Sequence, residues 1–256
     1  SPLRQVAYAI ARRDIKFVLS DAVGSQSRLL EHRTPKERVA RVAPWLTLDN
    51  DPYPTVVDGR IQWVVDGYTT SRTYPYSSRF SVSGVQDGTV SSIETQRRAA
   101  LVSDRVNYMR NSVKATVDAY DGTVKLYRWD ESDPVVAAWD KAFPGLITPR
   151  SEISGELMSH LRYPEDLFRM QRAVLADYHV TSARDFRAGQ DRWRVPNDPT
   201  VLADKKVAQP PYYLTMAMPG QGSPSWSLTS TYIPNGDREV MAGYLAVDAD
   251  AGSTKG

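Results

Sequence analysis

The chain has 256 residues, which is enough for one large domain or two small ones with a sizeable core. Its 32 basic and 30 acidic residues leave a net charge of +2, so the composition gives no general attraction to nucleic acid or anionic lipid. The absence of cysteine excludes disulfides, thiolate nucleophiles and zinc sites built on cysteine.

Two helices are predicted at the start of the chain. Apolar side chains recur at helical spacing over residues 3–20, which indicates one amphipathic helix. Thr34 and Glu37 are spaced as a capping box, with Pro35 at the first helical position. Pro44 is expected to end this second helix.

Two β-hairpins are predicted next. Each is centred on an Asp-Gly pair, the dipeptide that favours a two-residue turn. The turns and their strands are Asp58-Gly59 between 55–57 and 60–65, and Asp121-Gly122 between 112–119 and 123–129. Apolar residues alternate in the second hairpin, so these side chains are expected on one buried face: Val113, Ala115, Val117 and Ala119.

The second half of the chain holds two more predicted helices and three strands. Asp133 caps the first helix, and Pro164 opens the second, with carboxylates in its first turn where the helix dipole favours them. The buried faces are expected to be Val135, Val136, Trp139, Ala142 and Phe143 in the first, and Leu167, Met170, Val174, Leu175 and Tyr178 in the second. The strands are predicted over 212–218, 225–233 and 240–247, with Asn235-Gly236 between the last two.

These blocks predict an α+β fold, with antiparallel hairpins and a mixed sheet flanked by amphipathic helices. We expect a single domain over residues 1–256, with a possible subdivision near 130–150. Two polar stretches, 79–104 and 197–208, are expected to be mobile loops, although 94–102 has the composition of a short helix.

None of the common enzyme signatures occurs in the chain. It has no HExxH pair, no GxSxG elbow, no phosphate-binding Walker loop and no dinucleotide-binding glycine pattern, and no cofactor is predicted. Asp49, Asn50 and Asp51 supply closely spaced oxygens of the kind that calcium uses, and Asp58 and Asp66 lie downstream. A turn in which side chains bond to local backbone amides is the simpler explanation, and the sequence leaves both open.

Aromatic side chains crowd the segment 53–76, as they do on platforms that stack sugars or extended peptides, although core packing produces such clusters too. The candidate recognition residues are Asp66, Tyr68, Tyr74, Arg110 and Asn111. Arg110 and Asn111 could bind a carboxylate or a sugar hydroxyl while the tyrosines stack beside it. The alternative is an internal ion pair between Asp66 and Arg110 that holds the two hairpins in register.

Several longer motifs occur in a fixed order along the chain. They are Asp51-Pro52-Tyr53-Pro54, Asp66-Gly67-Tyr68-Thr69-Thr70-Ser71, Tyr74-Pro75-Tyr76-Ser77, Asn107-Tyr108-Met109-Arg110-Asn111-Ser112, His160-Leu161-Arg162-Tyr163-Pro164-Glu165-Asp166 and Tyr212-Tyr213-Leu214-Thr215-Met216. Through them, most of the chain resembles a family of large, uncharacterised multi-pass membrane proteins of actinobacteria and some cyanobacteria. The resemblance implies a piece of the extracytoplasmic part, whose parent protein is anchored in the membrane through other segments. It implies no catalytic residues. The start at Ser1-Pro2-Leu3, without an initiator Met, is also expected of an excised piece.

The predicted function is an interaction or binding module at the extracytoplasmic face of the cell membrane. Its partner would be an envelope component or another membrane protein, and not a nucleic acid. The alternative is a carboxylate- or metal-dependent hydrolase acting on envelope polymers. Carboxylates with shifted pKa values converging in a deep cleft would favour the enzyme, whereas an aromatic groove or an apolar patch would favour the binding module.

Overall fold

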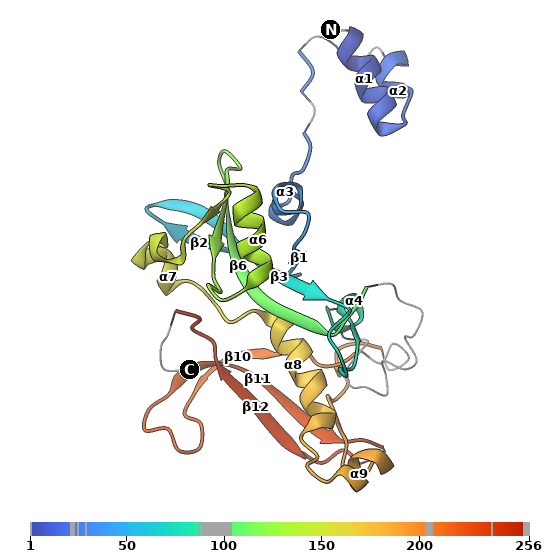
Figure 1. Ribbon diagram of the computed structural model, residues 1–256, viewed down its shortest axis with the longest axis vertical. Helices are drawn as coiled ribbons and strands as arrows, with labels where there is room; N and C mark the ends of the chain where they lie inside the picture. Colours follow the sequence, from blue (N-terminus) through green and yellow to red (C-terminus); the bar gives the residue numbers. More distant parts are fainter. Residues whose placement is uncertain are drawn as a thin grey trace. The chain divides into compact units, whose positions relative to one another are not determined.

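The computed structural model describes residues 2–20, 24, 26–28, 30–86, 88, 104–202, 207–236 and 238–252 (Figure 1). The chain divides into two compact units, Ser1–Arg33 and Thr34–Gly256. Every strand found in these described residues belongs to the second unit.

The first unit is helical, but the single helix predicted over 3–20 is wrong. The segment forms two helices, α1 (Pro2–Arg12) and α2 (Lys16–Leu19). The break falls at Arg13, whose backbone takes a left-handed φ of 52°. Just after it, the Asp14 carboxylate accepts a hydrogen bond from the backbone N–H of Lys16 at 3.0 Å. Local side-chain bonds of this kind compete with helical hydrogen bonding, which explains the interruption.

The larger sheet of the second unit is mixed, and it confirms the predicted α+β class. Its strands are β1 (Thr47–Leu48), β2 (Tyr53–Val57), β3 (Arg60–Ser71), β6 (Tyr108–Asp118), β7 (Val124–Arg128) and β8 (Ile147–Thr148). They lie in the order β1-β3-β6-β7-β8, with β2 also beside β3. All pairs are antiparallel except the parallel pair β7–β8.

Both predicted hairpins are confirmed. β2 and β3 meet at Asp58 and Gly59, whose φ angles of 51° and 70° are the positive values that this turn requires. β6 and β7 pair on either side of Asp121-Gly122, and Val117 is only 3% exposed. The expectation for Ala119 is wrong, because β6 ends one residue earlier and Ala119 is exposed in the turn.

Helices cover both faces of the larger sheet, so Ser112–Asp118 of β6 are all buried. On one face lie α3 (Pro35–Val42) and α6 (Pro134–Ala142), and on the other lies α7 (Gly155–Ser159). The capping box at the start of α3 and the Asp133 cap of α6 are both present, as predicted.

The buried stripe predicted for α6 is largely wrong. Val136 is buried, whereas Val135 and Phe143 are 41% and 52% exposed. Val136 and Trp139 are the residues of this helix that pack in the core cluster of the sheet. The indole ring of Trp139 stacks on that of Trp45, with ring centroids 5.3 Å apart. A prediction from the apolar stripe therefore overestimates how many residues of a short surface helix are buried.

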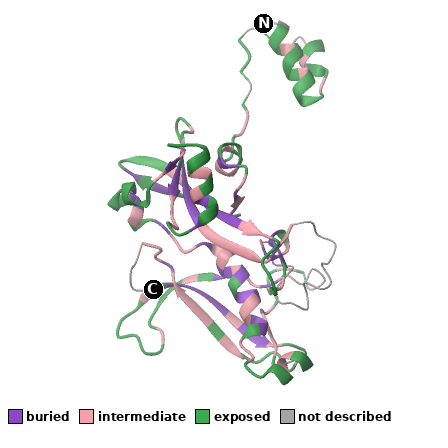
Figure 2. Ribbon diagram, in the orientation of Figure 1, coloured by how far each residue is buried: buried purple, intermediate pink, exposed green. Residues whose placement is uncertain are grey.

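The second sheet is antiparallel and packs on the long helix α8 (Glu165–Tyr178), which lies between the two sheets (Figures 1 and 2). Its strands are β9 (Trp193–Arg194), β10 (Tyr212–Met216), β11 (Ser225–Pro234) and β12 (Gly243–Asp248), and they follow α9 (Ala183–Ala188). β11 is central, with β12 on one side and β9 and β10 on the other. The three strands predicted here are confirmed, with ends shifted by a few residues.

The polar stretch 79–104 is better packed at its start than predicted. β4 (Phe80–Ser81) pairs with β5 (Arg105–Val106), and α4 (Val82–Gln86) follows β4. Phe80, Val82 and Val85 are buried in one cluster with two residues of α8. Residues 89–103, with the short helix considered over 94–102, lie outside the described residues, as do 203–206 of the second stretch.

Candidate functional site

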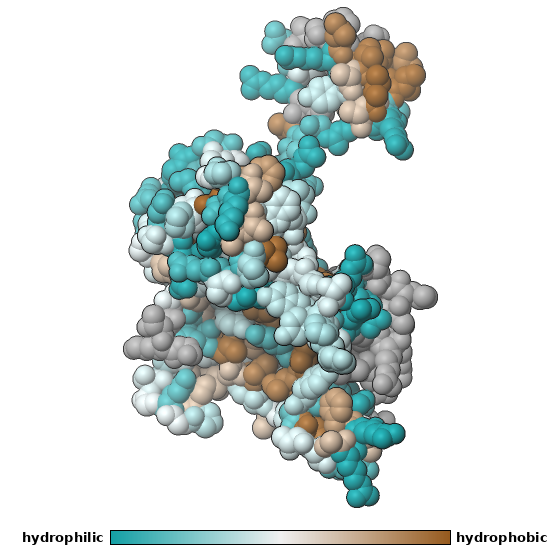
Figure 3. All heavy atoms as spheres, viewed as in Figure 1, coloured by the Kyte–Doolittle hydropathy of each residue, from teal (hydrophilic) through white to brown (hydrophobic). Residues whose placement is uncertain are grey.

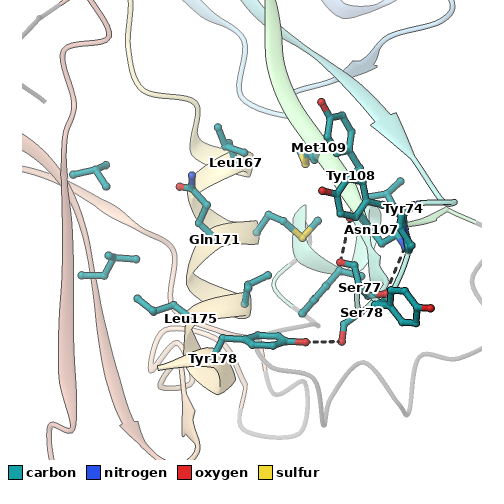
Figure 4. Close-up of a pocket in the computed structure, with 18 of the residues that line it drawn as sticks. Tyr74, Ser77, Ser78, Asn107, Tyr108, Met109, Leu167, Gln171, Leu175 and Tyr178 are labelled. Carbon is teal, nitrogen blue, oxygen red and sulfur yellow. Dashed lines mark hydrogen bonds between the residues drawn. The ribbon is translucent and has the colours of Figure 1, made fainter. Parts of the chain in front are cut away.

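A groove runs along one side of α8, with a volume of about 780 Å³ (Figures 3 and 4). Its floor is α8, one wall is β12, and the other wall is the start of β6 with the segment 74–78. We call it the α8 groove. Apolar side chains predominate in its lining, among them Met109, Leu167, Met170, Val174, Leu175 and Val247. Figure 3 shows apolar side chains gathered in this hollow between the two sheets.

The floor of the groove corrects the sequence prediction for α8. All five residues of the expected stripe line the groove. Met170 is buried as predicted, Leu167, Val174 and Leu175 are partly buried, and Tyr178 is 49% exposed. The buried residues of this helix lie mainly on other sides: Asp166, Phe168, Met170, Arg172, Ala173, Ala176 and Asp177. Because apolar residues occur almost all round α8, periodicity alone does not show which face the chain covers.

Polar anchors hold the covered side of α8 against the second sheet. Arg172 Nη1 donates to Ser230 Oγ at 3.2 Å, and the Tyr232 hydroxyl donates to the backbone carbonyl of Arg172 at 2.9 Å. Burial lowers the pKa of the Arg172 guanidinium to about 10. These contacts fix the rotation of the helix, and with it the face that is turned to the groove.

Tyrosines form the rim of the groove opposite β12. Tyr74 stacks on Tyr108, with ring centroids 5.8 Å apart. Asn107 exchanges two hydrogen bonds with the backbone of Tyr74, at 2.7 and 3.1 Å, which fixes this turn. At the far end, the hydroxyls of Tyr178 and Ser78 lie 3.1 Å apart (Figure 4). Hydrogen bonds within the chain therefore hold the rim in position.

A second hollow adjoins the groove and, unlike the groove, is lined in part by charged side chains. It has a volume of about 1200 Å³, and it shares Tyr163, Leu167 and Val247 with the α8 groove. We call it the polar hollow. Its charged lining residues are Arg110, Asp130, Asp248 and Asp250. An elongated molecule lying in both would meet an apolar surface at one end and hydrogen-bonding groups at the other.

The structure places the five predicted recognition residues in three settings. Tyr74 stands on the rim of the α8 groove, and Arg110 and Asn111 line the polar hollow. Asp66 and Tyr68 lie beneath them, 4% and 0% exposed. Asn111 Nδ2 donates to Asp66 Oδ1 at 2.9 Å, so these two are in contact. Tyr68 offers no surface to a ligand, because its ring is buried and its hydroxyl donates to Asp49.

The internal ion pair considered between Asp66 and Arg110 is replaced by two others. Asp66 Oδ1 lies 2.5 Å from Lys114 Nζ, and both side chains are buried. Arg110 instead pairs with Asp130, at the edge of the polar hollow. The exchange follows from strand register: Asp66 faces Lys114 across the β3–β6 ladder, whereas Arg110 faces Thr69 beyond a bulge.

Buried carboxylates connect the larger sheet to the first turn of α8. The backbone N–H of Asp166 donates to Asp49 Oδ2 at 3.1 Å. Asp166 Oδ2 in turn accepts from the Asn50 backbone and from the Gln86 amide, each at 2.7 Å. Burial, followed by the neighbouring charge of Asp49, raises the pKa of Asp166 to about 7. Burial also raises the pKa of Asp66.

The contribution of Asp166 to stability is expected to fall as the pH rises. The folded chain holds this proton up to about pH 7, whereas the unfolded carboxyl releases it near its ordinary pKa of 3.8. The contribution of Asp166 to the free energy of unfolding is therefore greatest below about pH 4, and it declines by up to a few kcal/mol between about pH 4 and pH 7. Asp166→Asn should unfold at a higher urea concentration than the parent at pH 8 and at a similar one at pH 4. Parallel pH profiles for the two proteins would contradict this assignment.

The aspartates at 49–66 do not assemble into a metal site in the structure. Across the described ranges, no three His, Asp or Glu side chains are placed to hold a metal ion. Asp49 Oδ1 accepts from the Asp51 backbone N–H at 2.8 Å, which is the local turn that the simpler explanation requires.

Comparison with known sequences places the chain in a family. The model of the uncharacterised protein family UPF0182 matches residues 1–256, and the chain belongs to this family. A UPF0182 protein of Kineococcus radiotolerans is 51% identical over 264 residues, covering 100% of this chain and 26% of its own length. One from Streptomyces coelicolor is 51% identical over 254 residues (99% and 25%), and one from Bifidobacterium longum is 54% identical over 258 residues (98% and 24%).

The chain thus spans about a quarter of the length of these actinobacterial relatives. No solved structure matches it. Among the helices of the described residues, none is long and apolar enough to span a bilayer.

Proposed function

We propose that this chain is a binding module of the cell envelope, and that the α8 groove holds an elongated apolar part of its partner. One observation carries the proposal: α8 turns an apolar face to the groove, and the described chain covers this face only in part between two walls. A continuous apolar surface of this kind is costly to expose to water and usually marks an interaction site. Tyrosines at the rim suit such a site, since each offers an apolar ring and a polar tip.

The proposed location is the extracytoplasmic face of the membrane. It is supported by the resemblance of the chain's motifs to large multi-pass membrane proteins. The relatives are about four times as long as this chain, which leaves ample room for membrane-anchoring segments elsewhere. The partner would then be an envelope component or a membrane protein.

A carboxylate-dependent hydrolase has less support. Three aspartates have raised pKa values. Asp66 and Asp166 are 4% exposed each and are occupied by hydrogen bonds within the fold, whereas Asp51 is exposed but lines neither hollow. In the polar hollow, Asp130 is bound to Arg110 and accepts from Ser132. A catalytic acid or base has to reach the substrate, and these carboxylates serve the fold instead.

The test uses anilinonaphthalene sulfonate, a dye whose emission rises in apolar surroundings. We expect it to bind the chain and Val174→Glu to abolish most of that emission, because a carboxylate on the groove floor makes dye burial unfavourable. Val135→Glu is the matched control, since Val135 is exposed on the surface of α6, outside the groove. The measurement is dye fluorescence titrated against each folded variant.

Equal dye binding by both variants would contradict the proposal, because the apolar site would then lie elsewhere. Circular dichroism of each variant shows that the loss comes from the groove and not from unfolding.

A further inference from the structure

β12 is an edge strand in the described part of the chain. It pairs with β11 over Gly243–Asp248, and no described strand lies on its other side. In an antiparallel ladder, every second residue directs its N–H and C=O away from the partner strand. β12 therefore presents a row of backbone donors and acceptors along the wall of the α8 groove.

The position that a neighbouring strand would take beside β12 is already occupied at one end by the chain itself. The Tyr163 backbone N–H donates to the Ala249 carbonyl at 2.8 Å, and the Ala251 N–H donates to the Leu161 carbonyl at 3.0 Å. Arg162 and Asp250 form the antiparallel bridge between these bonds. At Pro164 the chain turns into α8, and the pairing beside this edge ends. A further strand beside Gly243–Asp248 would continue a pairing that the fold has begun.

The side chains next to the free edge of β12 could pack against one face of an added strand. Leu167, Gln171 and Leu175 project from α8 toward β12 (Figure 4). An added strand would send alternate side chains onto this row, while Leu245 and Val247 lie beside it from β12. The six residues of β12 span about 20 Å, which is room for a short segment.

Two carboxylates at the end of β12 favour a basic residue in the added segment. Asp248 and Asp250 accept hydrogen bonds from nearby backbone N–H groups. No Lys or Arg of the described ranges forms an ion pair with either carboxylate. A basic side chain on the incoming segment would complement this end.

We propose that the α8 groove takes an extended polypeptide segment, which pairs as an added strand with the edge of β12. The segment carries apolar side chains at alternate positions and a basic residue near Asp248. This inference rests on the proposed function and names the class of its partner. Main-chain hydrogen bonds give such pairing its affinity, and pockets for alternate side chains give it selectivity.

The probe is a synthetic peptide of alternating valine and threonine with arginine at each end. Two controls keep its side chains but carry N-methyl groups on the valines or on the threonines. Only one set of amides can face β12, so one methylated peptide should bind about tenfold more weakly or worse, and the other nearly as well as the parent. Bound peptide should also slow hydrogen exchange of the amides at 243–248.

Four results would overturn the inference. If both methylated peptides bind like the parent, or if no peptide binds while the dye still does, the groove holds apolar groups without strand pairing and the proposed function stands. If the chain dimerises with its β12 amides protected without peptide, the occupant is a second copy. If neither peptide nor dye binds, both proposals fall.

Discussion

Replacing Lys114 by methionine is expected to lower the free energy of unfolding by about 3–5 kcal/mol. Lys114 Nζ lies 2.5 Å from Asp66 Oδ1, and the two side chains are 1% and 4% exposed. Without the lysine, the Asp66 carboxylate stays buried with Asn111 Nδ2 as its remaining side-chain donor. Methionine keeps most of the volume, so the change isolates the loss of the charge and of the hydrogen bond to the Arg162 carbonyl.

The measurement is urea denaturation at pH 7, with Arg128→Met as the control. Arg128 pairs with Asp140 at 2.7 Å, but both side chains are partly exposed and water screens the pair, so its loss should matter much less. Adding Asp66→Leu to Lys114→Met should restore part of the stability, because the unpaired charge is removed as well. If Lys114→Met and Arg128→Met unfold at the same urea concentration, the buried pair is not what holds β3 and β6 together.

The substitution Val117→Asp is expected to cost about 4 kcal/mol or more. Val117 is 3% exposed in the core between the larger sheet and the helices α3 and α6. A carboxylate there has no cationic partner within that apolar cluster. We expect the variant to be mostly unfolded or insoluble, as measured by the yield of folded protein and by far-ultraviolet circular dichroism.

Val56→Asp provides the comparison within the same sheet. Val56 lies on β2 and is 54% exposed, so an aspartate there stays in water. This variant should fold with nearly the parent's stability. Equal losses for the two variants would mean that strand propensity, and not burial, sets the cost.

Features that depend on a few neighbouring residues could be predicted from the sequence. Asp58-Gly59 supplies the two positive φ angles of its turn, and Thr34 with Glu37 supplies both bonds of a capping box. Neither needs knowledge of distant residues. The alternation in β6 similarly placed Val117 in the core.

Features that depend on distant partners were not predicted. The partner of Asp66 is set by the β3–β6 register, and a long connection between these strands hides that register from the sequence. Gly67 sits at the bulge in this ladder, where a side chain would approach Leu46 Cδ1 to 2.9 Å. Asp66 pairs with Lys114, whereas Arg110 pairs with Thr69 beyond the bulge, so the residue chosen from the sequence lies four positions before the true partner on β6.

For the candidate site, the sequence analysis named a few of the lining residues but not the floor of the groove. Tyr74, Arg110 and Asn111 do line the two hollows, whereas the groove floor on α8 was assigned to the core. The available signal was the width of the apolar surface on α8, since Phe168 and Ala176 lie off the predicted stripe. A helix that is apolar on several sides needs more than one partner, and the described chain covers only part of it.

The central claim is that the α8 groove is filled by a partner outside the cell. These 256 residues hold no cysteine, so a reporter cysteine can be introduced into this part of the full-length protein, with the unsubstituted full-length protein as the background for labelling. Gln171 is exposed on the groove floor, and Lys141 is exposed on α6 away from it. A membrane-impermeant maleimide should label Lys141→Cys in intact cells but label Gln171→Cys only slowly, whereas both should react alike in the purified chain. Equal labelling of both in intact cells would show an empty groove, and labelling of neither until the cells are opened would place the domain inside.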